Sequence, residues 1–327
     1  MTTKKIKSIA VLTSGGDAPG MNCAIRAVVR TCVSQGLKIF GIKRGYSGLL
    51  DDDIYEMNAR SVGNILQKGG TILQTSRCPD FHEKESRSKA AKILTDRGID
   101  ALIVIGGNGS FAGAYTLYQE HQFPVIGIPG TIDNDVFGSD YTIGFDTAVQ
   151  TAMEAVDKVR DTAASHKRNF FVEVMGRKSE AIALHVGVCT GAEFIVFPHK
   201  GIDYEKIHQN LKQGIDSGKQ ASIIIVQEDD RPGKSYEISE NLYKKYGLKS
   251  HVCILGHTQR GGKPTALDRF IASKMGFDAV HALLNGNHSA VTTFCDGKVI
   301  VKPFEQCVGV RDPYDLPYGD LAKELSI

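Results

Sequence analysis

Several features that would identify a membrane, secreted or zinc-binding protein are scarce or absent in this sequence. No apolar run approaches the roughly 18 residues that a membrane helix needs, so no membrane partner is expected. The seven cysteines are an odd number, lie far apart and include no C-x-x-C pair, which disfavours a redox or zinc motif and predicts reduced thiols. The first residues lead into a strand-like segment without the apolar stretch of a secretory signal, so a cytoplasmic location is expected.

Charge of a single sign is not concentrated anywhere along the chain. The 39 Lys and Arg residues nearly balance the 37 Asp and Glu residues. Without a basic block or stripe, a nucleic-acid partner is not expected. Hydrophobic residues make up 42% of the chain and charged residues 23%, which is typical of a folded globular protein.

Short β-branched runs alternate with longer segments of helical spacing, which predicts an α/β fold on a parallel sheet. Because 327 residues exceed what one hydrophobic core usually supports, two lobes are expected. A long helical pattern begins after Gly144, and this break is the best candidate for a crossing between lobes. The expected strands are residues 9–13, 39–43, 101–105, 125–128, 170–174, 223–227 and 252–255, and the expected helices are 22–32, 88–95, 145–160, 204–215 and 266–284.

The first expected strand is followed by a glycine-rich segment, residues 13–22 (TSGGDAPGMN), that leads into a helix. Glycine lets the main chain approach an anion, and a helix N-terminus offers unpaired N–H groups. The spacing from Gly15 to Gly20 imitates a P-loop, but Met21 and Asn22 replace its Lys and Ser or Thr, and G-x-G-x-x-G also fails. A phosphate loop and a plain strand-to-helix turn are equally compatible with this segment alone.

A second glycine-rich segment, residues 106–110 (GGNGS), follows the most apolar strand. Three glycines in four positions are costly to order unless the backbone passes close to another group. Ligands of parallel sheets bind beyond the carboxyl ends of the strands. Two such loops at strand ends therefore favour phosphate binding, and hence nucleotide or sugar-phosphate chemistry, over simple turns.

A third segment, residues 129–135 (PGTIDND), follows the expected strand at 125–128. Its two carboxylates could divide the work of phosphoryl transfer, with Asp133 accepting a proton from a hydroxyl and Asp135 anchoring Mg²⁺. The alternative is an ordinary turn, because Asp and Asn favour turns for local reasons.

Phosphoryl transfer also needs cations, and the arginine fork suits phosphate. Four arginines stand in loop contexts, three of them after expected strands whose ends should share one rim. Each one taken singly is more often a solvated surface residue, and the same applies to Glu228 and His257. The four are Arg77, Arg168, Arg177 and Arg260.

Four segments, in this order and at this spacing, resemble the bacterial-type, ATP-dependent 6-phosphofructokinase family. They are residues 13–22, 129–135, 172–177 (VEVMGR) and 255–262 (LGHTQRGG), and the similarity extends from Ile9 to about Pro303. The resemblance implies two Rossmann-like, three-layer lobes with mainly parallel sheets and an active site in the cleft between them. The larger, ATP-binding lobe would be residues 1–144 plus 259–309, and the smaller, sugar-phosphate-binding lobe 145–258 plus 310–327.

The resemblance also implies the reaction, which is transfer of a phosphoryl group from MgATP to the 1-hydroxyl of fructose 6-phosphate. Asp133 would be the base, with Thr131 and Arg177 also catalytic, and Asn108 and Asp135 would lie at Mg²⁺. The residues expected at ATP are Gly15, Arg77, Cys78, Gly107, Asn108, Gly109 and Ser110. Those expected at the sugar phosphate are Thr131, Ile132, Asp133, Met175, Gly176, Arg177, Glu228, His257, Thr258, Gln259 and Arg260. Arg168 and His251 would reach the same sugar phosphate from a neighbouring subunit. The family is usually a homotetramer.

Two positions bear on the phosphoryl donor. The pyrophosphate-using branch of the family has Asp and Lys where this chain has Gly109 and Gly130, so ATP is the expected donor. Other hypotheses are a kinase of the same fold with another donor or sugar phosphate, and an impaired paralogue that acts as a regulatory subunit. Retention of Asp133, Asp135 and Arg177 disfavours the impaired paralogue.

The sequence departs from the family at several positions. Asn108 replaces an Asp near magnesium, which predicts a raised Mg²⁺ requirement. His251 replaces an Arg on the sugar phosphate, so affinity should fall as rising pH discharges the imidazole. Cys78 and His82 replace an aromatic residue and an Arg along the nucleotide, which makes adenine specificity less secure. An effector site for ADP or phosphoenolpyruvate is only partly kept, at Arg26, Arg30, Arg160, Glu193 and Lys219, with Ala59 and Ser217 replacing two basic residues.

Overall fold

The computed structural model describes residues 5–309, 321, 324 and 325, and these form two units, each with its own sheet. The first unit holds described residues 5–147 and 260–309, and the second holds 148–259. The sequence suggested crossings after residues 144 and 258, whereas the chain crosses after Thr147 and Gln259. The expected segment 310–327 lies outside the described residues except at 321, 324 and 325.

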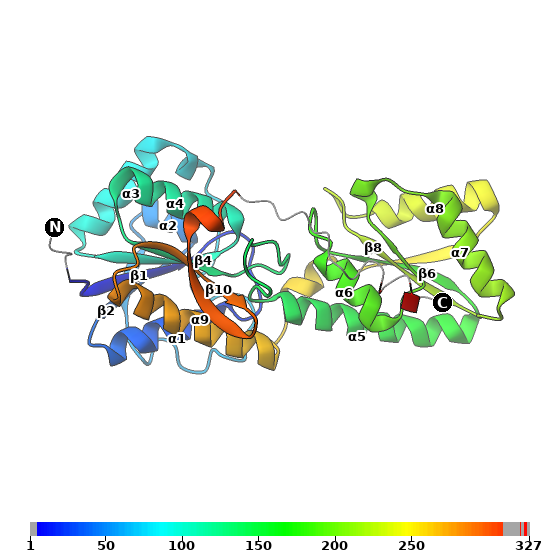
Figure 1. The fold of residues 1–327 in the computed structure, drawn as a ribbon, viewed down its shortest axis with the longest axis horizontal. Helices are drawn as coiled ribbons and strands as arrows, with labels where there is room; N and C mark the ends of the chain where they lie inside the picture. The colour runs from blue at the N-terminus through cyan, green and yellow to red at the C-terminus, as the bar shows by residue number, and fades with distance from the viewer. Residues whose placement is uncertain (1–4, 310–320, 322–323, 326–327) are drawn as a thin grey trace. The chain divides into compact units, whose positions relative to one another are not determined.

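The first unit is built on a seven-stranded sheet in the order β11-β10-β5-β4-β1-β2-β3 (Figure 1). Its inner strands β10, β5, β4, β1 and β2 run parallel, and the edge pairs β10–β11 and β2–β3 are antiparallel. Strands β1 and β4 are buried along their whole length because helices cover both faces. The strands are β1 Ser8–Thr13, β2 Lys38–Ile42, β3 Ile54–Met57, β4 Ala101–Gly106, β5 Val125–Pro129, β10 Ser289–Cys295 and β11 Lys298–Pro303.

Helices lie on both faces of this sheet, as expected for right-handed crossovers between parallel strands (Figure 1). One face carries α1, Met21–Ser34, and α9, Ala266–Leu284, which pack on each other. The other face carries α2 Gly45–Leu50, α3 Lys84–Asp96 and α4 Asn108–His121, with the short 3₁₀ helix η1 Pro79–His82 beside α3. A further 3₁₀ turn, η4 Phe304–Gln306, follows β11.

The second unit has a four-stranded parallel sheet in the order β7-β8-β6-β9. Helices α7 and α8 supply Ile207, Leu211, Ile238 and Leu242 to its buried core, and α5 and α6 lie on the other face (Figure 1). The strands are β6 Asn169–Val174, β7 Phe194–Val196, β8 Ser222–Gln227 and β9 Ser250–Ile254. The helices are α5 Phe145–His166, α6 Ala181–Thr190, η2 Pro198–Lys200, α7 Tyr204–Asp216, α8 Lys234–Tyr246 and η3 Gly256–Arg260.

The expected α/β class with mainly parallel sheets is confirmed, and every expected strand and helix is present within a few residues. Strands β3, β7, β10 and β11 were not predicted from the sequence. Residues Asn108 to Ser110, expected as a loop, are the first turn of α4. All seven cysteines are free. Among the described residues, no helix is both long enough and apolar enough to cross a membrane.

Candidate active site

The three segments singled out in the sequence follow β1, β4 and β5, which are neighbours in the first unit's sheet. Backbone hydrogen bonds join them just beyond the strands. Ser14 N donates to Ile105 O at 2.9 Å, and Gly130 N donates to Gly106 O at 2.9 Å. The two glycine-rich segments and the acidic segment therefore share one edge of the sheet.

The glycine positions allow these segments to approach one another closely. A Cβ at Gly106 would lie 2.6 Å from Ser14 O, and a Cβ at Gly107 would lie 3.5 Å from the Thr131 Cβ. Gly15 adopts a φ of 88°, which side-chain-bearing residues rarely adopt. Helix α4 begins at Asn108 without a side-chain cap, so its first N–H groups and positive dipole end lie beside this edge. Such an edge is suited to an anion.

In the acidic segment, exposed and buried side chains alternate. Ile132 and Asn134 are buried, whereas Asp133 and Asp135 are partly exposed. Asn134, at a φ of 49°, donates through Nδ2 to Asp140 O at 3.0 Å and accepts from Thr142 N at 2.8 Å. Asn134 thus makes the side-chain hydrogen bonds that stabilise the turn, and the carboxylates of Asp133 and Asp135 remain on the solvent side.

The acidic segment is also bound to the first turn of α4. Asn108 Nδ2 donates to Asp135 O at 2.9 Å and to Asp135 Oδ2 at 3.1 Å. Asp133 N donates to Thr131 Oγ1 at 3.2 Å. Asn108, predicted as a metal ligand, is thus placed with its amide group toward the Asp135 carboxylate.

The predicted nucleotide residues Arg77 and Cys78 lie in the connection between β3 and η1. Thr75 Oγ1 donates to Gly15 O at 2.8 Å and ties this connection to the first glycine-rich segment. Arg77 is exposed and Cys78 is half-buried. His82, the last residue of η1, is also exposed.

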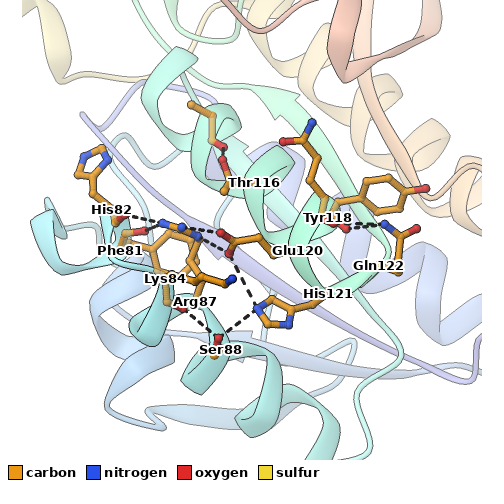
Figure 2. A network of polar contacts seen from close by, with 12 residues as sticks. Phe81, His82, Lys84, Arg87, Ser88, Thr116, Tyr118, Glu120, His121 and Gln122 are labelled. Atoms are coloured by element: carbon orange, nitrogen blue, oxygen red, sulfur yellow. Dashed lines mark hydrogen bonds and ion pairs between the residues drawn. The ribbon is translucent and has the colours of Figure 1, made fainter.

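A buried arginine fixes the end of this connection to α4 (Figure 2). Arg87 donates through Nε and Nη2 to the two oxygens of Glu120 at 2.7 Å each. Its Nη1 donates to Phe81 O at 2.9 Å and to His82 O at 2.6 Å. Phe81 in turn stacks on Tyr46, whose hydroxyl donates to Ser110 O at 2.6 Å and whose pKa is raised by burial. The segment after Arg77 is therefore held to the helix that begins at Asn108.

In the second unit, three predicted sugar-phosphate segments follow the parallel strands β6, β8 and β9. Glu228 N donates to Val174 O at 2.7 Å, and Leu255 N donates to Glu173 O at 3.0 Å, so the strand ends are adjacent. Met175 and Gly176 are buried, and Arg177 is exposed, as are His257 and Thr258. Gln259 is fully buried, and its Oε1 accepts from Met175 N at 2.8 Å.

Arg260 belongs to the first unit, where its guanidinium lies on the first glycine-rich segment. Its Nη1 donates to Asp17 O at 3.1 Å, and a Cβ at Gly16 would lie 2.6 Å from the same nitrogen. The predicted contact of Arg260 with a sugar phosphate stays a prediction.

Arg168 and His251 lie at the opposite edge of the second sheet. Arg168 directly precedes β6, and His251 pairs with Phe170 near the start of that strand and stacks on its ring. Both side chains are exposed. The structure therefore does not bring them to the edge that carries Met175, Gly176 and Arg177.

Of the expected effector residues, three meet in the second unit. Glu193 Oε1 lies 3.7 Å from Arg160 Nη1 and 3.7 Å from Lys219 Nζ. Arg26 and Arg30 are on α1 of the first unit.

Two buried polar residues with structural roles at these edges escaped the sequence analysis. Gln227, the last residue of β8, donates to the turn that carries Arg177, and Asp268 of α9 accepts from Gly144 N and Thr147 N. Both residues could have been noticed in the sequence, because Gln227 ends an apolar run and Asp268 interrupts one.

The first unit thus combines phosphate-binding loops with paired carboxylates at the carboxyl edge of a parallel sheet, which is the arrangement of an α/β phosphotransferase. The family model described as phosphofructokinase matches residues 8–283. The chain therefore belongs to the phosphofructokinase family.

Curated relatives and solved structures agree with this assignment. The ATP-dependent 6-phosphofructokinase of Coxiella burnetii is 50% identical over 299 residues, which are 91% of each chain. That of Clostridium botulinum (strain Alaska E43) is 47% identical over 322 residues, covering 98% of this chain and all of the relative. The Pichia pastoris phosphofructokinase in the T-state superposes with a TM-score of 0.86 at 37% identity, covering 93% of this chain but 35% of the much longer yeast chain.

Proposed function

We propose that this chain transfers the terminal phosphoryl group of ATP to the 1-hydroxyl of fructose 6-phosphate, giving fructose 1,6-bisphosphate and ADP. The bacterial relatives that match almost the whole chain are ATP-dependent 6-phosphofructokinases. The observation that carries the proposal is the hydrogen-bonded junction of the two glycine-rich segments with the segment of Asp133 and Asp135.

At this edge the chain's own groups divide the reaction between them. Asp133 accepts the proton of the attacking hydroxyl, because a carboxylate on the solvent side can reach a substrate and act as a base. The N–H groups at Gly15 and in the first turn of α4 bind phosphate oxygens of the nucleotide. In the second unit, Arg177 would offer a guanidinium to a phosphate of the substrates.

The carboxylate of Asp135 fits a magnesium ion that arrives with the nucleotide. Mg²⁺ at phosphates is usually held by one or two carboxylates together with the substrate's own oxygens. When bound, the ion supplies positive charge to the phosphate oxygens. Asp135 would hold it, and Asn108 orients Asp135 through the two hydrogen bonds from its amide.

Local packing supports ATP as the donor. A Cβ at Gly109 would meet no atom within 4 Å, so this first-turn position leaves space for the rest of a nucleotide. A Cβ at Gly130 would lie 3.0 Å from Ile105 Cγ2 and 3.1 Å from Met21 Cε, so the lysine of the pyrophosphate-using branch would be crowded there.

The remaining expectations stay part of the proposal. The first unit would bind ATP and the second the sugar phosphate, in a homo-oligomer, and the expected cleft between the lobes stays a prediction. Location in the cytoplasm and control by a nucleotide or phosphoenolpyruvate are proposed on the same family resemblance.

A coupled assay of the purified protein with fructose 6-phosphate and MgATP tests the proposal. Turnover is expected, and Asp133→Ala should reduce it by about 10²- to 10⁴-fold because the general base is lost. Asp96→Ala is the matched control, because Asp96 is an exposed residue of α3 whose carboxylate pairs with Lys92 at 2.7 Å. Parallel assays with GTP and pyrophosphate identify the donor. Absence of turnover with every donor would refute the proposal.

A further inference from the structure

The turn after β6, residues 175–179, has a strained backbone. Gly176 has a φ of 150°, and Arg177 has a φ of 48°, in the left-handed region that a side-chain-bearing residue rarely adopts. Ser179 N donates to Gly176 O at 2.8 Å, and a Cβ at Gly176 would lie 2.6 Å from Ser179 O. Such a conformation is unfavourable and persists only where the surroundings fix it.

Gln227 supplies part of that constraint. It is the last residue of β8 and is fully buried. Its Nε2 donates to Arg177 O at 2.6 Å and to Ser179 O at 2.9 Å. Both protons of one amide group are therefore used on the two carbonyls of the turn, one of them on the residue in the left-handed conformation.

Gln259 holds the other end of the same turn. Its Oε1 accepts from Met175 N at 2.8 Å, and its Nε2 lies 3.4 Å from Ala148 O. Gln259 is also fully buried. Two buried glutamines, one at the end of β8 and one in η3, thus bind the backbone before and after Gly176, and neither side chain is turned to solvent.

The orientation of the Gln227 amide is dictated by its partners. Arg177 O and Ser179 O can only accept, so the NH₂ group must face them. Its Oε1 is buried without a hydrogen-bond partner among the described residues. Leaving a buried acceptor unpaired is unfavourable. That cost is tolerated here in exchange for two bonds that only an amide donor can make.

We propose that Gln227 is a positioning residue, which with Gln259 holds the Met175–Arg177 backbone in the shape that presents the Arg177 side chain to the sugar phosphate. The proposal rests on the proposed function for the role of Arg177, but not for the structural role of Gln227. The amide donor of Gln227 is the essential feature, because both acceptors are backbone carbonyls.

Two substitutions of similar size separate the donor from the bulk of the side chain. Gln227→Glu places carboxylate oxygens against two carbonyl oxygens, and Gln227→Met removes both donors without adding charge. Each is expected to raise the KM for fructose 6-phosphate by about tenfold while the KM for ATP stays unchanged. Each should also speed amide hydrogen exchange within residues 175–179. Gln213→Glu, at an exposed position of α7, is the control and should match the wild type.

The pH dependence of the Glu variant supplies a readout that a purely structural defect would not give. A protonated carboxyl can donate one bond to Arg177 O or Ser179 O, so lowering the pH should partly restore the KM in Gln227→Glu but not in Gln227→Met. The other charged or titratable groups on the elements around this turn are common to both variants. They are Glu173, Arg177, Lys178, Glu180, His185, His199, Lys200, Glu228, Asp229, Asp230, His257 and Arg260.

The outcomes distinguish this inference from the proposed function. Unchanged hydrogen exchange at residues 175–179 in both variants would show that Gln227 does not hold the turn. Faster exchange with an unchanged KM for fructose 6-phosphate would show that the turn does not govern sugar binding. If the wild type itself lacks turnover, the proposed function fails, and the exchange measurement still decides the role of Gln227.

Discussion

The amide of Asn108 carries out at the acidic segment what a carboxylate could not do. It donates to both the backbone oxygen and the carboxylate of Asp135, so the two groups attract each other without a cation between them. An Asp at this position would instead place two negative groups about 3 Å apart, a repulsion that a divalent cation relieves.

The change Asn108→Asp should therefore strengthen the binding of Mg²⁺ at this site. The added charge is expected to lower the half-saturating free Mg²⁺ concentration by about tenfold, because Mg²⁺ affinity rises with ligand charge. Turnover measured against free Mg²⁺ at saturating nucleotide checks this. Asn285→Asp, at an exposed position after α9, controls for charge alone. An unchanged Mg²⁺ curve would contradict the role given to Asn108.

Asp268 predicts a pH dependence of stability. Burial raises the pKa of its carboxyl from 3.8 to about 6, against the lowering effect of hydrogen bonds from Thr147 and from Gly144 N. Because the folded pKa exceeds the unfolded one, the stabilising contribution is full below about pH 4 and is lost as pH rises through 6.

The measurement compares the wild type with Asp268→Asn in urea unfolding between about pH 4 and pH 7. The free energy of unfolding of the wild type, relative to the variant, should fall by roughly 2 kcal/mol over this range. Asn cannot titrate, so the difference isolates Asp268. A difference that is constant with pH would exclude a raised pKa at this carboxyl.

At the residue scale, the expectations for the site rest on residue types that stand out in loops. Glycines and acids at strand ends, such as Gly15, Gly107 and Asp133, can be recognised in the sequence. Loops accept many residue types, so glycine and acidic residues gathered there indicate a function. Gln227 and Gln259 could not be recognised as positioning residues from the sequence. Their partners are backbone carbonyls and amides far along the chain, and no local pattern encodes such pairs.

At the scale of elements, Arg87 and Glu120 connect helices α3 and α4 beside the segment that follows Arg77 (Figure 2). Arg87→Lys would lose the fork that reaches Glu120 and the carbonyls of Phe81 and His82 together. We expect the KM for ATP to rise by about three- to tenfold, because the segment after Arg77 loosens, with the KM for fructose 6-phosphate unchanged.

Steady-state kinetics with each substrate varied in turn checks this expectation. Lys92→Arg, on the exposed face of the same helix, is the matched control. Glu120→Gln should give a similar rise, and combining it with Arg87→Lys should add little, because both changes break one network. Equal effects on both substrates would point to general destabilisation instead.

The four missed strands were missed for two different reasons. Strands β3 and β7 have four and three residues, too few to show a period. The β10–β11 hairpin was detectable, because Asp296 and Gly297 between two β-branched runs form a turn with φ values of 48° and 74°, as in a type I′ turn. Its two antiparallel strands fall outside the strand-helix alternation on which the expectation was built.

At the scale of the whole molecule, the chain passes from the first unit to the second after Thr147, and the structure shows a reason for this position. Helix α5 begins at Phe145, but Asp268 of the first unit accepts hydrogen bonds from Gly144 N and from Thr147. The first turn of α5 is therefore bound to the first unit, and the crossing follows it. No sequence pattern near residue 145 reports on an acid at 268.

Strand β6 separates two groups of residues assigned to the same ligand. Arg168 precedes its six residues and Met175 follows them, so the two lie about 23 Å apart at about 3.3 Å per residue. That span is longer than a hexose phosphate. If both groups bind fructose 6-phosphate, they do so in different sites of an assembly, each site taking Arg168 from another copy of the chain.

Complementation between two impaired variants tests this sharing of sites. Arg168→Ala and Asp133→Ala should each be strongly impaired alone. After dissociation and reassembly of an equal mixture, about one quarter of the sites should combine an intact Asp133 with an intact Arg168 from another copy, and activity should recover to that extent. Asp133→Ala mixed with Asp135→Ala is the control, because both residues lie on one segment and no site can be restored. If differently tagged subunits co-purify from the first mixture and activity still fails to return, Arg168 does not act across subunits.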